Sequence, residues 1–289
     1  MKTLFFKLTT LFALTGLIFL GCSKKSNESA ATQRYITVKG SDTMVHLASN
    51  WAESFMEMHP EYEISVTGGG SGTGIAALIN GTTDVCIASR NIKPKEITLA
   101  KQKGQNPVEH AVARDGIAVI VNPANPVNEL TLEQIGKIYT GAYSNWNQMG
   151  GKNQSIVVNS RESSSGTYVF FQEFVLNKKD YAPTANLMPS TAAIVQSVSQ
   201  DEQAIGYVGL GYVHDAGDAI KVLGVKAETN SPAVPASEAT ILAGEYPVSR
   251  ELYIYTNGEP VGLTKAFLDF MLTPEGQQIV SETGYVPVK

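Results

Sequence analysis

The sequence predicts an α/β protein with enough chain for two domains, and three observations lead to this prediction. The chain has 289 residues, of which only a short leading segment falls outside the fold. Strands alternate with helices through short polar turns, which is typical of a mostly parallel sheet covered by helices. A long β-like run over 110–121 is interrupted by Asp115-Gly116, so it can leave one domain and enter another.

The leading segment has the pattern of a secretory signal peptide. Lys2 and Lys7 form a basic region, and residues 8–20 are largely apolar but short for a membrane span. Phe19-Leu20-Gly21-Cys22 is close to the bacterial lipoprotein cleavage box, which usually has leucine where Phe19 stands. We therefore expect a signal peptide over 1–21 that is removed at Cys22. The alternative is an ordinary signal peptide with a nearby cysteine.

Cleavage there predicts a lipid, palmitate included, on the mature N-terminus at Cys22, which would tether the protein to a membrane. Residues 22–34 are polar and small, as a flexible tether requires. Cys86 is then the only other cysteine, so no intramolecular disulfide can form. It lies in the strand pattern 84–88, where it is best interpreted as a small buried apolar residue.

The formal net charge of −5 becomes more negative when the two signal lysines leave, so nucleic acid is excluded as a partner. The four histidines show no metal-ligand spacing, and the sequence calls for no metal and no cofactor.

The elements of the first half follow in order from apolar alternation and turn residues. Strands are expected over 35–39, 63–67 and 84–88, with helices over 44–58 and 75–79. His59-Pro60 ends the first helix and Gly81 the second. A helix and loop rich in Lys and Gln follow over 95–107.

The second half of the sequence also predicts helices that alternate with strands. One of its strands is expected to return to the first half. Helices are expected over 132–139, 168–176, 191–199, 263–272 and 274–283, and strands over 155–159 and 204–209. Residues 227–244 are rich in Pro and Ala and are expected to form a long excursion. The strand pattern 248–255 is the expected return crossing, so the two connections at 114–117 and 248–252 would act as a hinge.

The turn Arg161–Thr167 carries the main functional prediction. Its hydroxyls and Gly166 stand between a strand and a helix, where backbone N–H groups and the helix dipole favour an anion. Arg161 adds a planar donor fork that matches a tetrahedral oxyanion. The alternative is a serine-rich helix cap with a surface arginine. Three more turns share this chemistry at sheet-edge positions: Ser41/Thr43, Ser71/Thr73 and Ser89/Arg90.

Two enzyme-like interpretations fit less well. Residues 72–77 match the dinucleotide pattern G-x-G-x-x-A, but the next strand ends in Ser89-Arg90 where an acidic residue is required. There is no P-loop and no G-x-S-x-G elbow, because Thr73 stands where the second glycine would be. A phosphoryl-handling hydrolase therefore remains the alternative from a different class.

Several of these motifs together resemble a known family. Gly40-Ser41-Asp42-Thr43, the glycine-rich turn 69–74, Ala88-Ser89-Arg90 and Ser160-Arg161-Glu162-x-x-Ser165-Gly166-Thr167 recur in the order found in the PstS family. Its members are phosphate-binding components of ABC transporters. The similarity extends over essentially the whole mature chain, including 204–209 and 273–277.

The resemblance implies a type II periplasmic-binding-protein fold, in which two α/β domains joined by a two-strand hinge close around one ligand. Domain I would comprise 35–115 and 250–289, and domain II 116–249. The implied function is high-affinity binding of inorganic phosphate outside the cytoplasm and its delivery to a membrane permease, with no enzymatic activity. The protein would be a lipid-anchored monomer in the periplasm or at the cell surface. A receptor for another oxyanion such as sulfate is the alternative.

The resemblance also implies a set of ligand-binding residues. They are Ser41, Thr43, Met44 through its backbone N–H, Ser71, Ser89, Arg90, Arg161, Ser165, Gly166 and Thr167. Some family members have an aspartate at the position of Arg90 that accepts the proton of HPO4²⁻, and another at the position of Ser163. Without the first, Asp42, Asp115 or Glu162 would have to accept that proton, and Asp115 is our choice among them.

Overall fold

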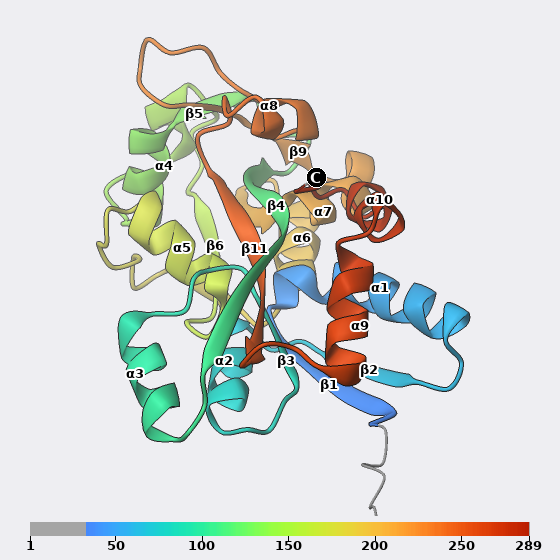
Figure 1. The fold of residues 1–289 in the computed structure, drawn as a ribbon. Coiled ribbons are helices and arrows are strands. Elements are labelled where there is room, and N and C mark those ends of the chain that lie inside the picture. The colour runs from blue at the N-terminus through green and yellow to red at the C-terminus, as the bar shows by residue number, and fades with distance from the viewer. Residues whose placement is uncertain (1–32, 289) are drawn as a thin grey trace, which may run out of the picture. The chain divides into compact units, whose positions relative to one another are not determined.

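The computed structural model describes residues 33–288, and a central mixed sheet organises them (Figure 1). Nine strands form this sheet, in the order β2-β1-β3-β11-β4-β8-β6-β7 with β9 beside β4. Their bounds are β1 Tyr35–Gly40, β2 Glu63–Thr67, β3 Val85–Ala88, β4 Pro107–Val121, β6 Val157–Arg161, β7 Asn186–Met188, β8 Ala204–Gly209, β9 Lys221–Val222 and β11 Ser249–Asn257. A separate two-stranded sheet pairs β5 Glu129–Thr131 with β10 Gly224–Lys226.

The helices connect these strands. Their bounds are α1 Val45–Met58, α2 Ser71–Ile79, α3 Pro94–Gln102, α4 Leu132–Tyr139, α5 Gly166–Phe174, α6 Thr191–Gln200, α7 Leu210–Ala216, α8 Glu238–Leu242, α9 Gly262–Met271 and α10 Pro274–Glu282. Short 3-10 helices are η1 Asp42–Met44, η2 Trp146–Met149 and η3 Gly217–Ala219. Within the described range no helix is both long and apolar enough to cross a membrane.

β4 and β11 run antiparallel to one another through the middle of the sheet (Figure 1). β4 changes its partner along its length, because residues 107–116 pair with β11 and residues 117–121 pair with β8. The two ends of one 15-residue strand therefore belong to two groups of strands. In the first group β2, β1 and β3 are parallel, and in the second β8, β6 and β7 are parallel.

The apolar core is divided at the point where β4 changes its partner. Two buried clusters draw on residues 36–113 and 252–285, and include Trp51, Phe55 and Phe267. The other two draw on residues 117–248 together with Val286. Cys86 is fully buried within the first group, as its strand pattern predicts, and burial raises the pKa of its thiol, which keeps it protonated and unreactive.

The predicted α/β class is confirmed, and three strands match their predicted positions closely, at 35–40, 63–67 and 204–209. Other predicted bounds were wrong by several residues. α2 begins at Ser71 rather than at Ile75, because small residues open the helix before its apolar face starts. β6 ends at Arg161, so that residue closes a strand rather than opening a turn. The signal peptide, Cys22 and the tether up to Thr32 lie outside the described residues.

Candidate functional site

The carboxyl ends of β1, β2 and β3 bring three serines together. Ser41 follows β1, Ser71 is the first residue of α2, and Ser89 follows β3. The Ser41 hydroxyl donates to Ser89 Oγ at 2.9 Å, and the Ser71 and Ser89 hydroxyl oxygens lie 3.2 Å apart. The Ser89 backbone N–H also donates to Ser71 Oγ at 3.0 Å. All three serines are at most 1 % exposed, so these groups are satisfied mainly by one another.

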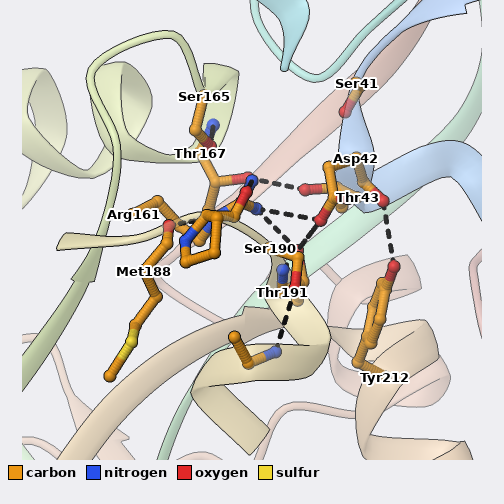
Figure 2. A network of polar contacts seen from close by, with 12 residues as sticks. Ser41, Asp42, Thr43, Arg161, Ser165, Thr167, Met188, Ser190, Thr191 and Tyr212 are labelled. Atoms are coloured by element: carbon orange, nitrogen blue, oxygen red, sulfur yellow. Dashed lines mark hydrogen bonds and ion pairs between the residues drawn. The ribbon is translucent and has the colours of Figure 1, made fainter. Parts of the chain in front are cut away.

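Two threonines extend this set of hydroxyls. One follows β1 in the first group of strands, and the other follows β6 in the second group. Thr43 lies in η1 after β1, and Thr167 lies in the first turn of α5. Their hydroxyl oxygens are 2.7 Å apart, although 124 residues separate them in sequence (Figure 2). We call Ser41, Thr43, Ser71, Ser89 and Thr167 the hydroxyl cluster.

The starts of α2 and α5 face one another across this cluster. The Gly72 N–H, in the first turn of α2, donates to the Ser164 carbonyl at 2.9 Å. A Cβ atom on Gly166 would lie 2.3 Å from Ser71 Oγ and 2.7 Å from Ser89 Oγ, so only glycine permits this approach. Ser165 caps α5 by accepting from the N–H groups of Thr167 and Tyr168. Two helix N-termini, each with positive potential, thus converge on the hydroxyls.

Arg161 lies beside the two threonines, in the network that Figure 2 shows. Its Nη1 donates to Thr191 Oγ1 at 2.7 Å and is 3.3 Å from Asp42 Oδ2. Its Nε and Nη2 donate to the carbonyl oxygens of Met188 and Pro189. The residue is 2 % exposed. Burial lowers the pKa of Arg161 and the Asp42 carboxylate opposes that shift, so the guanidinium stays charged.

Asp42 is therefore the carboxylate that neutralises Arg161. Its Oδ2 also accepts from the Thr191 N–H at 2.7 Å and from the Thr191 hydroxyl at 2.9 Å, at the start of α6. The carboxylate joins η1 to β6 and α6, which belong to different groups of strands.

Arg90 is not brought into the hydroxyl cluster. Its guanidinium pairs with both oxygens of Glu96, at 2.9 and 2.8 Å, and also donates to the Asn91 carbonyl. The Nε atom is buried with no hydrogen-bond partner in the part of the chain that the structure describes. Arg90 instead lines a hollow of about 490 Å³ with Lys93, Lys95, Phe170 and Glu173.

The buried arginine that bonds to the hydroxyl cluster is Arg250, which was not among the predicted site residues. It donates to Thr167 Oγ1 at 3.0 Å, to the Ser89 carbonyl at 2.7 Å and to Asp115 Oδ2 at 2.8 and 3.1 Å. The available signal was an arginine at the start of an otherwise apolar strand, at the same crossing as Asp115.

Asp115 was predicted as a proton acceptor, and the structure buries it completely. Its Oδ2 accepts from Arg250, and its Oδ1 accepts from the Leu210 N–H at 2.9 Å. Burial raises the pKa of Asp115, and the Arg250 guanidinium opposes that rise. Both carboxylate oxygens are therefore engaged within the protein.

Two more predicted residues have defined places. Met44 is fully buried, and its backbone N–H donates to the Ser41 carbonyl at 3.1 Å within η1. Glu162, like Asp42 an alternative proton acceptor, is exposed. Among residues 33–288, no group of three or more His, Cys, Asp or Glu side chains is arranged to hold a metal ion.

Comparison with known proteins shows similarity along most of the chain. The PBP superfamily domain matches residues 25–275. The phosphate-binding protein PstS of Pseudomonas aeruginosa is 34% identical over 266 residues, covering 86% of this chain and 81% of the relative. The protein of the same name from Bacillus subtilis is 34% identical over 276 residues, covering 93% and 87%.

A solved structure matches as well. The substrate-binding protein of a phosphate ABC transporter from Clostridium perfringens, with bound phosphate, is 34% identical and has a TM-score of 0.79. The match covers 88% of this chain and all of that one. The type II periplasmic-binding-protein fold is thereby confirmed. The chain belongs to the PBP superfamily and, within it, to the family of the phosphate-binding proteins PstS.

Proposed function

We propose that this protein binds inorganic phosphate outside the cytoplasm and delivers it to the permease of an ABC transporter. The observation that carries the proposal is the convergence of two helix starts on a buried hydroxyl cluster. The N–H groups of Ser71 and Gly166, the first residues of α2 and α5, form no hydrogen bond within the described residues. They are donors of the kind that hold oxyanions at helix N-termini.

The predicted ligand residues supply further donors around this point. They are Ser41, Thr43, Ser71, Ser89, Arg161, Ser165, Gly166 and Thr167. Arg90 would act only at the neighbouring hollow, and the Met44 N–H, which donates to the Ser41 carbonyl, would have to change its partner to bind the anion. At about 1.5–3 kcal/mol for each charge-assisted bond, the gross sum over about eight to ten such donors exceeds the roughly 8 kcal/mol that a micromolar complex requires. The excess would offset the dehydration of a doubly charged anion.

We also propose that the anion is bound between two domains that close like a hinge. Domain I would comprise 35–115 and 250–289, and domain II 116–249, with crossings at 114–117 and 248–252. The change of partner along β4 at Gly116 and the division of the apolar clusters support these boundaries. Hinge closure around a ligand is a common motion of binding proteins that cross between domains twice.

The protein would be a monomer, held at a bacterial membrane by lipid on Cys22 and carrying out no chemistry of its own. Support for a binding role comes from the polar groups of the site, which face one another as donors and acceptors. Mass spectrometry of the mature N-terminus tests the lipid, and an unmodified Cys22 would refute this part of the proposal.

Isothermal titration calorimetry with phosphate, sulfate and arsenate tests the ligand. Tight binding of phosphate with weak binding of sulfate is expected, and saturation by sulfate with indifference to phosphate would refute the proposal in favour of another oxyanion receptor. Turnover of a chromogenic phosphate ester would instead favour the hydrolase.

A variant tests the site. Arg161→Ala should weaken phosphate binding by a factor of roughly 100 or more, since a buried charged donor is lost. The control is Arg34→Ala, which removes an exposed arginine that precedes β1 and lies outside both proposed crossings. Circular dichroism establishes that both variants fold. Unchanged phosphate affinity in folded Arg161→Ala would exclude the site as described.

A further inference from the structure

Arg250 joins three segments that meet at the hydroxyl cluster. It stands in β11, and its guanidinium reaches Asp115 in β4, the Ser89 carbonyl after β3 and the Thr167 hydroxyl in α5. Ser89 and Thr167 lie on opposite sides of the proposed domain boundary. The side chain is 3% exposed, so these bonds form away from bulk water. The guanidinium also lies over the Phe170 ring, at 5.4 Å from its centre.

Asp115 fixes the direction of this guanidinium. Its Oδ2 accepts from both Nε and Nη2 of Arg250, and its Oδ1 is held by the Leu210 N–H. A planar fork that is fixed along one edge has its remaining N–H groups in set directions. Those remaining donors point to Ser89 and Thr167.

The bond from Arg250 to Thr167 determines what the Thr167 hydroxyl can do. Its oxygen accepts from Nη2 at 3.0 Å, so its own proton is directed to another acceptor. In this structure the neighbouring oxygen is that of Thr43, at 2.7 Å. A nearby positive charge also makes the hydroxyl a stronger donor. A donor of this kind favours an anion oxygen that carries no proton.

We propose that Arg250 is a positioning residue of the anion site, which turns the Thr167 hydroxyl into a fixed donor toward the bound anion. The inference rests on the proposed binding of phosphate and adds Arg250 to the residues that the site requires. Arg250 acts through Thr167, while Asp115 serves to hold Arg250. In this arrangement the Asp115 carboxylate is committed to Arg250, so it does not receive the proton of the anion.

A double-mutant cycle on phosphate affinity tests the proposal. Arg250→Gln and Thr167→Val should each weaken binding by 10-fold to 100-fold, by order of magnitude for one buried donor. The double variant should be hardly weaker than either single variant, because both remove the same donor. Arg250→Lys retains the charge without the fork and should fall between wild type and Arg250→Gln.

Two controls separate positioning from a merely structural role. Thr191→Val removes a hydroxyl that is bonded to Arg161 and not to Arg250, so its effect should multiply with that of Arg250→Gln. Thr167→Ser keeps the hydroxyl and should keep both the affinity and the coupling to Arg250. If Arg250 only supported the fold, the loss of phosphate affinity in Arg250→Gln would multiply with the loss in Thr167→Val, just as it multiplies with the loss in Thr191→Val.

The possible results can be distinguished from one another. If the wild-type chain binds phosphate and Arg250→Gln binds it equally well, the inference fails while the proposed function stands. Multiplicative effects of Arg250→Gln and Thr167→Val also overturn the inference. If the wild-type chain binds no phosphate, the proposed function fails first and the inference with it. Should Arg250→Gln fail to fold, the cycle is completed with Arg250→Lys, for which the same outcomes apply.

Discussion

The hydroxyl oxygens of Thr43 and Thr167 lie 2.7 Å apart, and both residues are at most 2 % exposed. Thr43 is placed by the end of β1, and Thr167 by the start of α5. The contact therefore exists only because two strand groups bring their carboxyl ends together. It marks the point at which an anion would receive donors from both sides.

Thr43→Val should weaken phosphate binding by roughly 10-fold to 100-fold and lower the free energy of unfolding by about 1 kcal/mol. Valine keeps the shape of threonine but leaves the buried Thr167 hydroxyl without this partner. Calorimetric titration and denaturant unfolding measure the two effects. Thr98→Val, at an exposed hydroxyl in α3, is the control and should change neither. Equal phosphate affinity in Thr43→Val would contradict the assignment of Thr43 to the site.

Gly166→Ala should weaken phosphate binding at least tenfold, because its methyl group would lie 2.3 Å from Ser71 Oγ. The starts of α2 and α5 would have to separate, and the anion would lose donors from one of them. Small-angle scattering should then show less compaction on addition of phosphate than in wild type. Gly150→Ala is the control, since no atom lies within 4 Å of its added carbon and only its backbone is strained. Wild-type affinity in Gly166→Ala would show that this approach is not needed for binding.

Asp115→Asn should lower the free energy of unfolding by about 3–5 kcal/mol, since it leaves the buried Arg250 guanidinium without a counter-charge. Chemical denaturation measures the change. Glu129→Gln breaks the more exposed ion pair with Lys226 and should cost at most about 1 kcal/mol. A small effect at Asp115, similar to that at Glu129, would mean that the Arg250 charge is compensated in another way.

Glu96 gives a pH prediction. Burial by itself favours its neutral form, but hydrogen bonds from Arg90 and from the Lys93 N–H lower its pKa below the ordinary value of 4.5. The carboxylate thus contributes stability that is fully present above about pH 4.5 and is lost as the pH falls through the folded-state pKa. Wild-type unfolding free energy should therefore fall more steeply below pH 4.5 than that of Glu96→Gln. Parallel curves for the two proteins would exclude this linkage.

Local patterns predicted most elements because the signals are local. Apolar alternation predicted β1 and β2, and a short apolar run predicted β8. In the structure Thr131 and Gln134 form the capping box that opens α4. The elements that were missed are short or depend on distant partners. β9 has two residues and exists only through pairing with β4, and α7 follows β8 directly with a glycine at its cap. Such segments carry too few residues to show a period.

For the site, the sequence by itself determined which residue types collect at strand ends: hydroxyls, glycines and the two arginines Arg90 and Arg161, at turns that favour an anion. It could not determine how buried charges are paired, because partners such as Asp42 and Arg161 are far apart in the chain. Only the tertiary structure decided that Glu96 holds Arg90 away from the hydroxyl cluster and that Arg250 enters it. The physical reason is that a buried guanidinium must have a carboxylate and satisfied donors, and only packing brings these into reach.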